Sequence, residues 1–138
     1  MMATFRFELV SPDQLLYSAD VESVVVPGTE GEFTVLPNHA PLVTSLRSGG
    51  VILVNGDRSS KEFAVFGGVA EVTNTSLTIL AERTTPLKEV TPAGLDQEIL
   101  TAQTFLEAAH GEAEKRLLHE KIAQLREFKD VVAARQAG

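Results

Sequence analysis

The sequence predicts an α+β protein, with an N-terminal antiparallel β-sandwich of about nine or ten short strands and a C-terminal antiparallel hairpin of two helices. Up to residue 82, short runs rich in Val, Phe, Thr and Leu are separated by turn residues, which is typical of an all-β domain. After Pro92, proline is absent and Ala, Glu, Gln, Leu and Lys become common, which favours helices. We therefore expect a sandwich domain over 1–86, a linker over 87–91 and a helical domain over 92–138.

The expected strands follow one another without a crossover helix. In the first, Phe5, Phe7 and Leu9 alternate with polar or less apolar neighbours, as in a strand with one buried face. The others are 15–18, 21–26, 32–36, 41–46, 50–54, 61–66, 68–72 and 76–80. Their separators include Ser11-Pro12-Asp13, Pro27-Gly28, Gly49-Gly50, Asn55-Gly56-Asp57, Gly67-Gly68 and Asn74-Thr75. Asn55-Gly56 is the strongest turn signal, because a two-residue hairpin turn needs positive φ angles that Asn and Gly adopt at low cost.

Two helices are expected after the linker. Thr91 can cap the first and Pro92 fits its first position. Its apolar face comprises Leu95, Ile99, Ala102 and Leu106. Gly111 ends this run, and the acidic residues Glu112 and Glu114 suit the start of the second helix. The apolar face of the second helix comprises Leu118, Ile122, Leu125, either Phe128 or Lys129, and Val132.

Charge and composition exclude several classes of function. A total of 12 Lys and Arg against 19 Asp and Glu gives a net charge of −7, so we expect no nucleic-acid partner. The absence of cysteine excludes disulfides and cysteine-ligated zinc. No stretch approaches the roughly 18 consecutive apolar residues of a membrane span, so we expect membrane contact only through partners.

The charge is divided unequally along the chain. Residues 1–111 hold 6 basic and 14 acidic residues, a net charge of −8, whereas residues 112–138 hold 6 and 5, a net charge of +1. The last helix is therefore the element best suited to meet an acidic surface.

The sequence contains no recognisable metal, phosphate or nucleophile motif. His39, His110 and His119 match no zinc-binding spacing, because the last two are not placed on one helix face. Neither glycine pair, Gly49-Gly50 or Gly67-Gly68, is followed by the Lys and helix start of a phosphate loop. We expect no catalytic residue, no metal and no cofactor.

The segment 29–43, TEGEFTVLPNHAPLV, holds the polar cluster that most resembles a site. Its polar side chains are Glu30, Glu32, Asn38 and His39. A carboxylate near an imidazole can act in acid/base catalysis, but the chain supplies no nucleophile or electrophile to work with them. We favour a docking corner, shaped by Gly31, Pro37 and Pro41 and anchored by Phe33, Val35 and Leu36.

Several sequence blocks occur together and in order. They are SPD at 11–13, PGTEGEF at 27–33, LPNHAPL at 36–42, GGVAEV at 67–72, and an Ala/Glu/Lys-rich tail containing KIAQLRE at 121–127. Over nearly the whole chain, this succession resembles the epsilon subunit of bacterial F-type ATP synthases. That family has a flattened β-sandwich followed by a two-helix hairpin, in agreement with the two halves expected from periodicity and composition.

The resemblance implies a non-catalytic rotor subunit of a proton-translocating ATP synthase. In the family, the sandwich lies at the foot of the central stalk, against the gamma subunit and the polar loops of the c-ring, and couples ring rotation to ATP synthesis. It also implies a peripheral location at the cytoplasmic face of the bacterial plasma membrane. The rotor interface would include Glu30, Glu32, Asn38 and His39.

The resemblance further implies that the hairpin is a regulatory element. When extended, it would enter the catalytic head and obstruct rotation in the direction of ATP hydrolysis. Its basic residues would then meet acidic segments of the beta and alpha subunits; these residues are Lys115, Arg116, Arg126 and Lys129.

One departure from the family bears on nucleotide binding. Some members bind ATP in the hairpin through a pattern of the form Ile/Leu-Asp-x-x-Arg-Ala. Here Asp96 is kept, but Ile99 and Leu100 stand in place of the arginine and alanine. The loss of a cation that could pair with phosphate argues against ATP binding.

Two alternatives to the rotor subunit remain. One is an independent hydrolase built around Glu32 and His39, and the other is a free-standing sandwich adaptor whose helical tail binds another acidic partner. Only the rotor subunit accounts for the whole ordered set of blocks.

Overall fold

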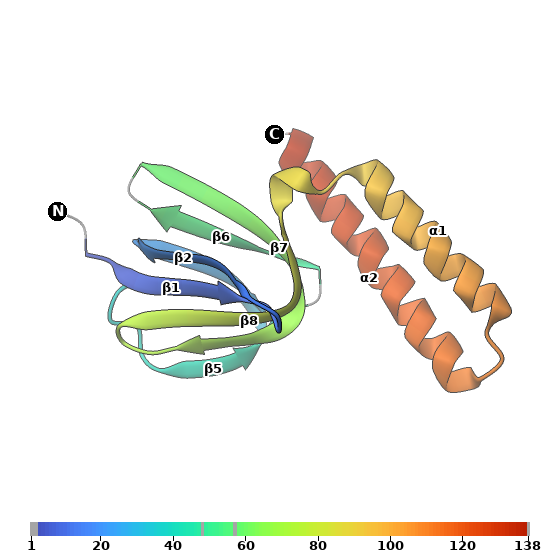
Figure 1. Cartoon of the computed structure of the whole chain (residues 1–138), viewed down its shortest axis with the longest axis horizontal. Helices are drawn as coiled ribbons and strands as arrows, with labels where there is room; N and C mark the ends of the chain where they lie inside the picture. The colour runs from blue at the N-terminus through green and yellow to red at the C-terminus, as the bar shows by residue number, and fades with distance from the viewer. Residues whose placement is uncertain (1–2, 48, 57, 138) are drawn as a thin grey trace. The chain divides into compact units, whose positions relative to one another are not determined.

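The computed structural model describes residues 3–47, 49–56 and 58–137. The chain divides into two compact units, Met1–Leu87 and Lys88–Gly138 (Figure 1). This division falls inside the segment 87–91 that we expected to be a linker. The first unit holds the strands and the second holds both α-helices, so the α+β class is confirmed.

The first unit is a mixed sheet of eight strands that forms a sandwich. The strands are β1 (Phe5–Val10), β2 (Leu15–Val21), β3 (Ser23–Gly28), β4 (Gly31–Val35), β5 (Leu42–Ser45), β6 (Gly50–Gly56), β7 (Ser59–Val72) and β8 (Ser76–Pro86). Their order is β2-β1-β8-β7-β6-β3-β4, and β5 also pairs with β7. The strands β2 and β4 therefore end this order.

Two details of the expected sandwich need correction. The sheet is not wholly antiparallel, because β1 and β8 run parallel. The expected strands 61–66 and 68–72 form one continuous strand, β7, so the described residues hold eight strands rather than nine or ten. Gly67 and Gly68 therefore do not form a turn between two strands.

The two glycines lie where β7 changes its partner. One edge of β7 pairs with β6 up to Val65 and with β5 from Val69 on (Figure 1). Between these two ladders, Gly67 and Gly68 have φ angles of 75° and 133°. Only glycine adopts such angles readily, so the pair lets one strand bend and serve both parts of the sandwich.

The hairpin turn between β6 and β7 also differs from the expectation. Gly56 pairs with Ser59, so Asn55 and Gly56 belong to the β6–β7 ladder, whereas position 57 of the expected separator lies outside the described residues. Arg58 supplies a positive φ of 71°. Asn55 instead lies within β6, where its side-chain amide donates to Ser23 Oγ at 3.1 Å. Asn55 therefore joins β6 to β3 and does not form the expected turn.

The core of the sandwich is apolar. The expected alternation in β1 is confirmed, since Phe5, Phe7 and Leu9 are buried. The ring of Tyr17 on β2 lies 6.0 Å from that of Phe7 and 5.5 Å from that of Phe63 on β7, which links three strands. Among the described residues no polar or charged side chain is buried. The described interior of the sandwich therefore consists of packed apolar side chains.

The second unit is a pair of antiparallel helices. After a short 3-10 turn, Leu87–Glu89, the helices are α1 (Pro92–Ala108) and α2 (Glu112–Ala137), which lie side by side (Figure 1). Thr91 caps α1, because its hydroxyl oxygen accepts from the Gly94 amide at 3.0 Å. The second helix begins at Glu112. Both helices therefore start where the sequence predicts.

The apolar faces of the two helices are largely as expected. On α1, Leu95, Ile99 and Ala102 are buried and Leu106 is half-buried. On α2, the buried residues are Ile122, Leu125, Phe128 and Val132, so Phe128 and not Lys129 continues the face. Within the described ranges, no helix has the length and apolar character needed to cross a bilayer.

Candidate functional site

The segment 29–39, here called the corner, consists of β4 and the turn on each side of it. Gly28 pairs with Gly31, so β3 and β4 are joined by the two residues Thr29 and Glu30. Gly31 has a φ of 137°, which requires glycine, and no other atom lies within 4 Å of where its Cβ would be. The tight turn leaves the Glu30 side chain exposed.

Alternation along β4 decides which side chains of the corner face outward. Glu32 and Thr34 are exposed, whereas Phe33 packs against the core and Val35 is buried. Leu36, which we expected to anchor the corner, is 54% exposed and does not. It follows β4 in the next turn, so the alternation no longer applies to it.

The residues LPNH (36–39) form the turn after β4. The His39 amide donates to the Leu36 carbonyl at 3.1 Å, which closes a four-residue turn. Asn38, its third residue, has a φ of 65°. Proline at the second position and a positive φ at the third are the features of a type II turn, and Asn tolerates that φ better than most residues.

The imidazole of His39 is held in place by its neighbours. Its Nδ1 lies 2.7 Å from the Ala40 carbonyl oxygen, which can only accept, so Nδ1 carries the proton in this contact. Its ring centroid lies 6.4 Å from that of Phe33. The side chain is half-buried, whereas Asn38 beside it is exposed. The ring position is thus set by the corner itself.

Segments distant in sequence fix both ends of the corner. The Thr29 amide donates to the Ser45 carbonyl at 3.0 Å, and the Asn38 amide donates to the Asn74 carbonyl at 3.1 Å. Ser45 belongs to β5, and Asn74 lies between β7 and β8. The corner is therefore a rigid surface element that presents Glu30 and Glu32 to solvent.

This arrangement is poorly suited to acid/base chemistry. Such chemistry needs a carboxylate and an imidazole within hydrogen-bond reach, usually in a cleft. Here both carboxylates are exposed, and Nδ1 of His39 is engaged by a backbone carbonyl. Over the described part of the chain, no group of three or more His, Asp or Glu side chains could hold a metal ion. The geometry instead fits a polar contact surface.

The structure places the four expected basic residues of the hairpin in different surroundings. Lys115 Nζ lies 3.9 Å from a carboxylate oxygen of Glu112 one turn earlier, whereas Arg116 and Arg126 are exposed. Lys129 Nζ lies 2.6 Å from Asp96 Oδ1 across the hairpin. Sequence reasoning had assigned Asp96 and Lys129 to separate roles, because their contact depends on the register between the two helices.

The altered nucleotide pattern on α1 can now be placed. Ile99, at the position of the missing arginine, is buried on the apolar face, and Asp96 is engaged by Lys129. In this conformation, Ile99 offers no cation to a nucleotide phosphate. The Asp96 carboxylate is occupied by Lys129.

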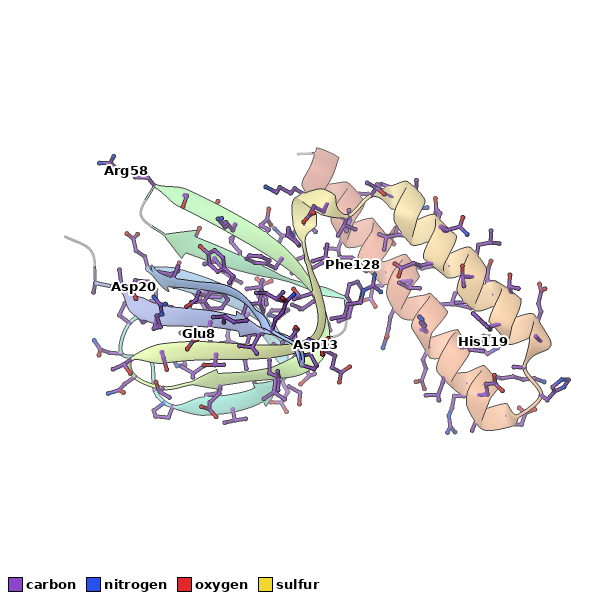
Figure 2. The ribbon with its side chains drawn as sticks, viewed as in Figure 1. Glu8, Asp13, Asp20, Arg58, His119 and Phe128 are labelled. Carbon is purple, nitrogen blue, oxygen red and sulfur yellow. The ribbon has the colours of Figure 1, made fainter. Side chains whose placement is uncertain are left out.

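Sequence reasoning missed a row of exposed apolar residues across the sandwich. Val69 pairs with Leu80, Leu80 with Val10, and Val10 with Leu15, so the row crosses β7, β8, β1 and β2. Val69, Leu80 and Leu15 are 40%, 48% and 54% exposed. The next row on the same side includes Glu71 and Glu8 (Figure 2 labels Glu8). An exposed apolar row beside carboxylates is typical of a protein interface.

Comparisons with known proteins agree with this architecture. Residues 4–86 match the family described as the beta-sandwich domain of the ATP synthase delta/epsilon chain. The ATP synthase epsilon chain of Sinorhizobium medicae is 41% identical over 132 residues, which cover 96% of this chain and 98% of that protein. The epsilon chain of Paracoccus denitrificans is 45% identical over 109 residues, which cover 79% of this chain and 74% of that protein.

Solved structures show the same fold. A chain of the Euglena gracilis mitochondrial ATP synthase superposes with a TM-score of 0.76 at 23% identity, covering 97% of this chain and 82% of that one. A chain from the central stalk and c-ring of the Tetrahymena thermophila mitochondrial ATP synthase gives a TM-score of 0.65 at 12% identity, covering 95% and 98%. The likeness extends over both the sandwich and the helices.

Proposed function

Because this chain belongs to the family of ATP synthase epsilon chains, we propose that it couples c-ring rotation through the gamma subunit to ATP synthesis in a bacterial proton-translocating enzyme. The chain is a non-catalytic subunit of that enzyme, as its family is. The observation that carries the proposal is the identity of 41% to an epsilon chain over 96% of this chain. The subunit would work as a peripheral protein at the cytoplasmic face of the plasma membrane.

The corner is the part of the sandwich that we propose to dock on the c-ring. Its Glu30 and Glu32 side chains are exposed on a segment fixed at both ends by hydrogen bonds to Ser45 and Asn74. A rigid acidic surface complements polar, basic loops without a further cost of ordering. The neighbouring Asn38 and His39 would complete this contact.

The exposed apolar row is the part of the sandwich that we propose to pack on gamma. Val69, Leu80 and Leu15 are exposed, and the half-buried Val10 lies between Leu80 and Leu15, so the row offers one stretch of apolar area. Burying such area is the main favourable term in a stable association, whereas the corner contributes charge. The two surfaces would therefore hold one subunit between gamma and the ring.

The hairpin is the element that we propose to inhibit ATP hydrolysis, without ATP as its ligand. Its exposed Arg116 and Arg126 can meet acidic segments of the beta and alpha subunits when the hairpin extends. With Ile99 buried where ATP-binding members carry arginine, the hairpin lacks that cation for phosphate.

Deleting residues 88–138 tests the regulatory proposal in the assembled enzyme. The sandwich forms a separate unit with its own core, so we expect the truncated chain to fold and the enzyme to remain assembled and coupled. ATP hydrolysis by membranes should rise by about fivefold, the lower end of ordinary coupling energies between sites. An unchanged hydrolysis rate with normal ATP synthesis would remove the inhibitory role.

A further inference from the structure

An ion pair between Asp96 on α1 and Lys129 on α2 joins the two helices of the hairpin. Lys129 Nζ donates to Asp96 Oδ1 at 2.6 Å, the short distance of a charge-assisted hydrogen bond. The two side chains are 37% and 56% exposed, so solvent can reach and compete for both. Each follows a residue of the apolar face, Leu95 on α1 and Phe128 on α2.

The pair lies far from the turn that connects the two helices. The two helices are tied covalently at one end by the turn between Ala108 and Glu112. Asp96 lies about 18 Å along α1 from that turn, given the rise per residue of an α-helix. The pair is thus close to the open end of the hairpin, where no chain connection keeps the helices together. Separation of the helices would begin at this end.

The pair also determines whether Lys129 is available. The Lys129 ammonium group is engaged by the Asp96 carboxylate at 2.6 Å in the closed hairpin. When the helices separate, Lys129 and Asp96 lose this contact and can meet other charges. Because one lysine cannot serve both partners fully, an acidic partner surface that binds Lys129 favours the open hairpin by linkage.

We propose that Asp96 and Lys129 form a latch that favours closure of the open end of the hairpin, and that opening of the hairpin frees Lys129 for another partner. The consequence for ATP hydrolysis rests on the regulatory role proposed above, whereas the latch itself is a property of the isolated chain. An exposed pair contributes modestly, so the latch biases the opening equilibrium and does not lock it.

Amide hydrogen exchange of the full-length chain measures this bias. In the variants Lys129→Gln and Asp96→Asn, we expect amides of residues 122–132 to exchange about two- to fivefold faster than in the unchanged chain, as the loss of an exposed ion pair implies. The double variant should exchange no faster than the faster single variant. Either single substitution already abolishes the ion pair, so the second has no further interaction to remove. In molar salt the ratio of each variant's exchange rate to that of the unchanged chain should fall towards one, because screening weakens the ion pair.

Matched controls separate the latch from a general loss of charge. Lys121→Gln removes an exposed lysine from the same helix and should leave these rates unchanged. Amides of β1 report the sandwich and should not respond in any variant. The latch is refuted if both single variants exchange at the unchanged rate, if their effects add fully in the double variant, or if Lys121→Gln accelerates exchange equally. None of these exchange measurements depends on ATP synthase activity. They therefore test the latch independently of the effect that deleting residues 88–138 has on ATP hydrolysis.

Discussion

Replacement of Gly68 by alanine is expected to destabilise the sandwich by about 4 kcal/mol or more, among the larger effects of single substitutions. A Cβ at this position would lie 2.2 Å from the Leu80 carbonyl oxygen and 2.9 Å from Ala81 Cα. Both atoms are backbone atoms of β8 and cannot rotate away. The φ of 133° adds conformational strain for any L side chain. Relief would require β7 and β8 to move apart at the bend.

Gly31→Ala is the matched control for this prediction. Gly31 has a nearly identical φ of 137°, but no atom lies within 4 Å of its added Cβ. It should cost only the conformational strain, about 1–3 kcal/mol. Urea unfolding followed by the fluorescence of Tyr17, the one tyrosine in a chain without tryptophan, reports the sandwich specifically. Equal destabilisation by the two variants would show that the close approach of β8 is unimportant.

The second large effect is expected at the corner. Glu32→Lys combined with His39→Ala should weaken attachment of the catalytic head to the membrane ring by several kcal/mol, because like charges would then face each other. The lysine would stand on the exposed face of the edge strand β4, where Glu32 stands now. ATP-driven proton pumping by membrane vesicles should therefore be lost, while the chain itself folds normally.

Asp20→Lys provides the same change of charge at the other end of the strand order, where it also removes the 3.5 Å contact between Asp20 and Arg6. Asp20 is exposed on β2, whereas Glu32 lies on β4. Membrane vesicles that carry Asp20→Lys should retain ATP-driven proton pumping. Normal pumping in the variant with Lys at position 32 and Ala at position 39 would contradict the docking assignment.

Most of the fold could be predicted because it depends on local pattern. The alternation of Phe5, Phe7 and Leu9 and the cap at Thr91 are both found where the sequence predicts them. Gly67-Gly68 fits a hairpin or a bulge on the sequence alone, so the division into two strands there is wrong: a glycine pair has the same local signature in a turn and in a bend. Only the pairing of β7 with both β6 and β5 distinguishes the two cases.

The candidate site was partly predictable for the same reason. Exposure of Glu32 and burial of Val35 follow from alternation along β4, whereas Leu36 lies beyond the strand and is exposed. The contact between Asp96 and Lys129 depends on the register of two helices, which no local pattern specifies. The apolar row from Val69 to Leu15 likewise appears only when four strands are aligned.

Cross-linking from position 32 tests the docking of the corner most directly. The chain contains no cysteine, so Glu32→Cys gives a single labelling site on the exposed face of β4. Arg58→Cys, at the tip of the β6–β7 hairpin (Figure 2), serves as the control site. In assembled membranes, a short photoactivated cross-linker at position 32 should capture the c subunit, and the control site should not. Capture of only alpha or beta subunits from position 32, or equal capture of c from both sites, would contradict docking of the corner on the c-ring.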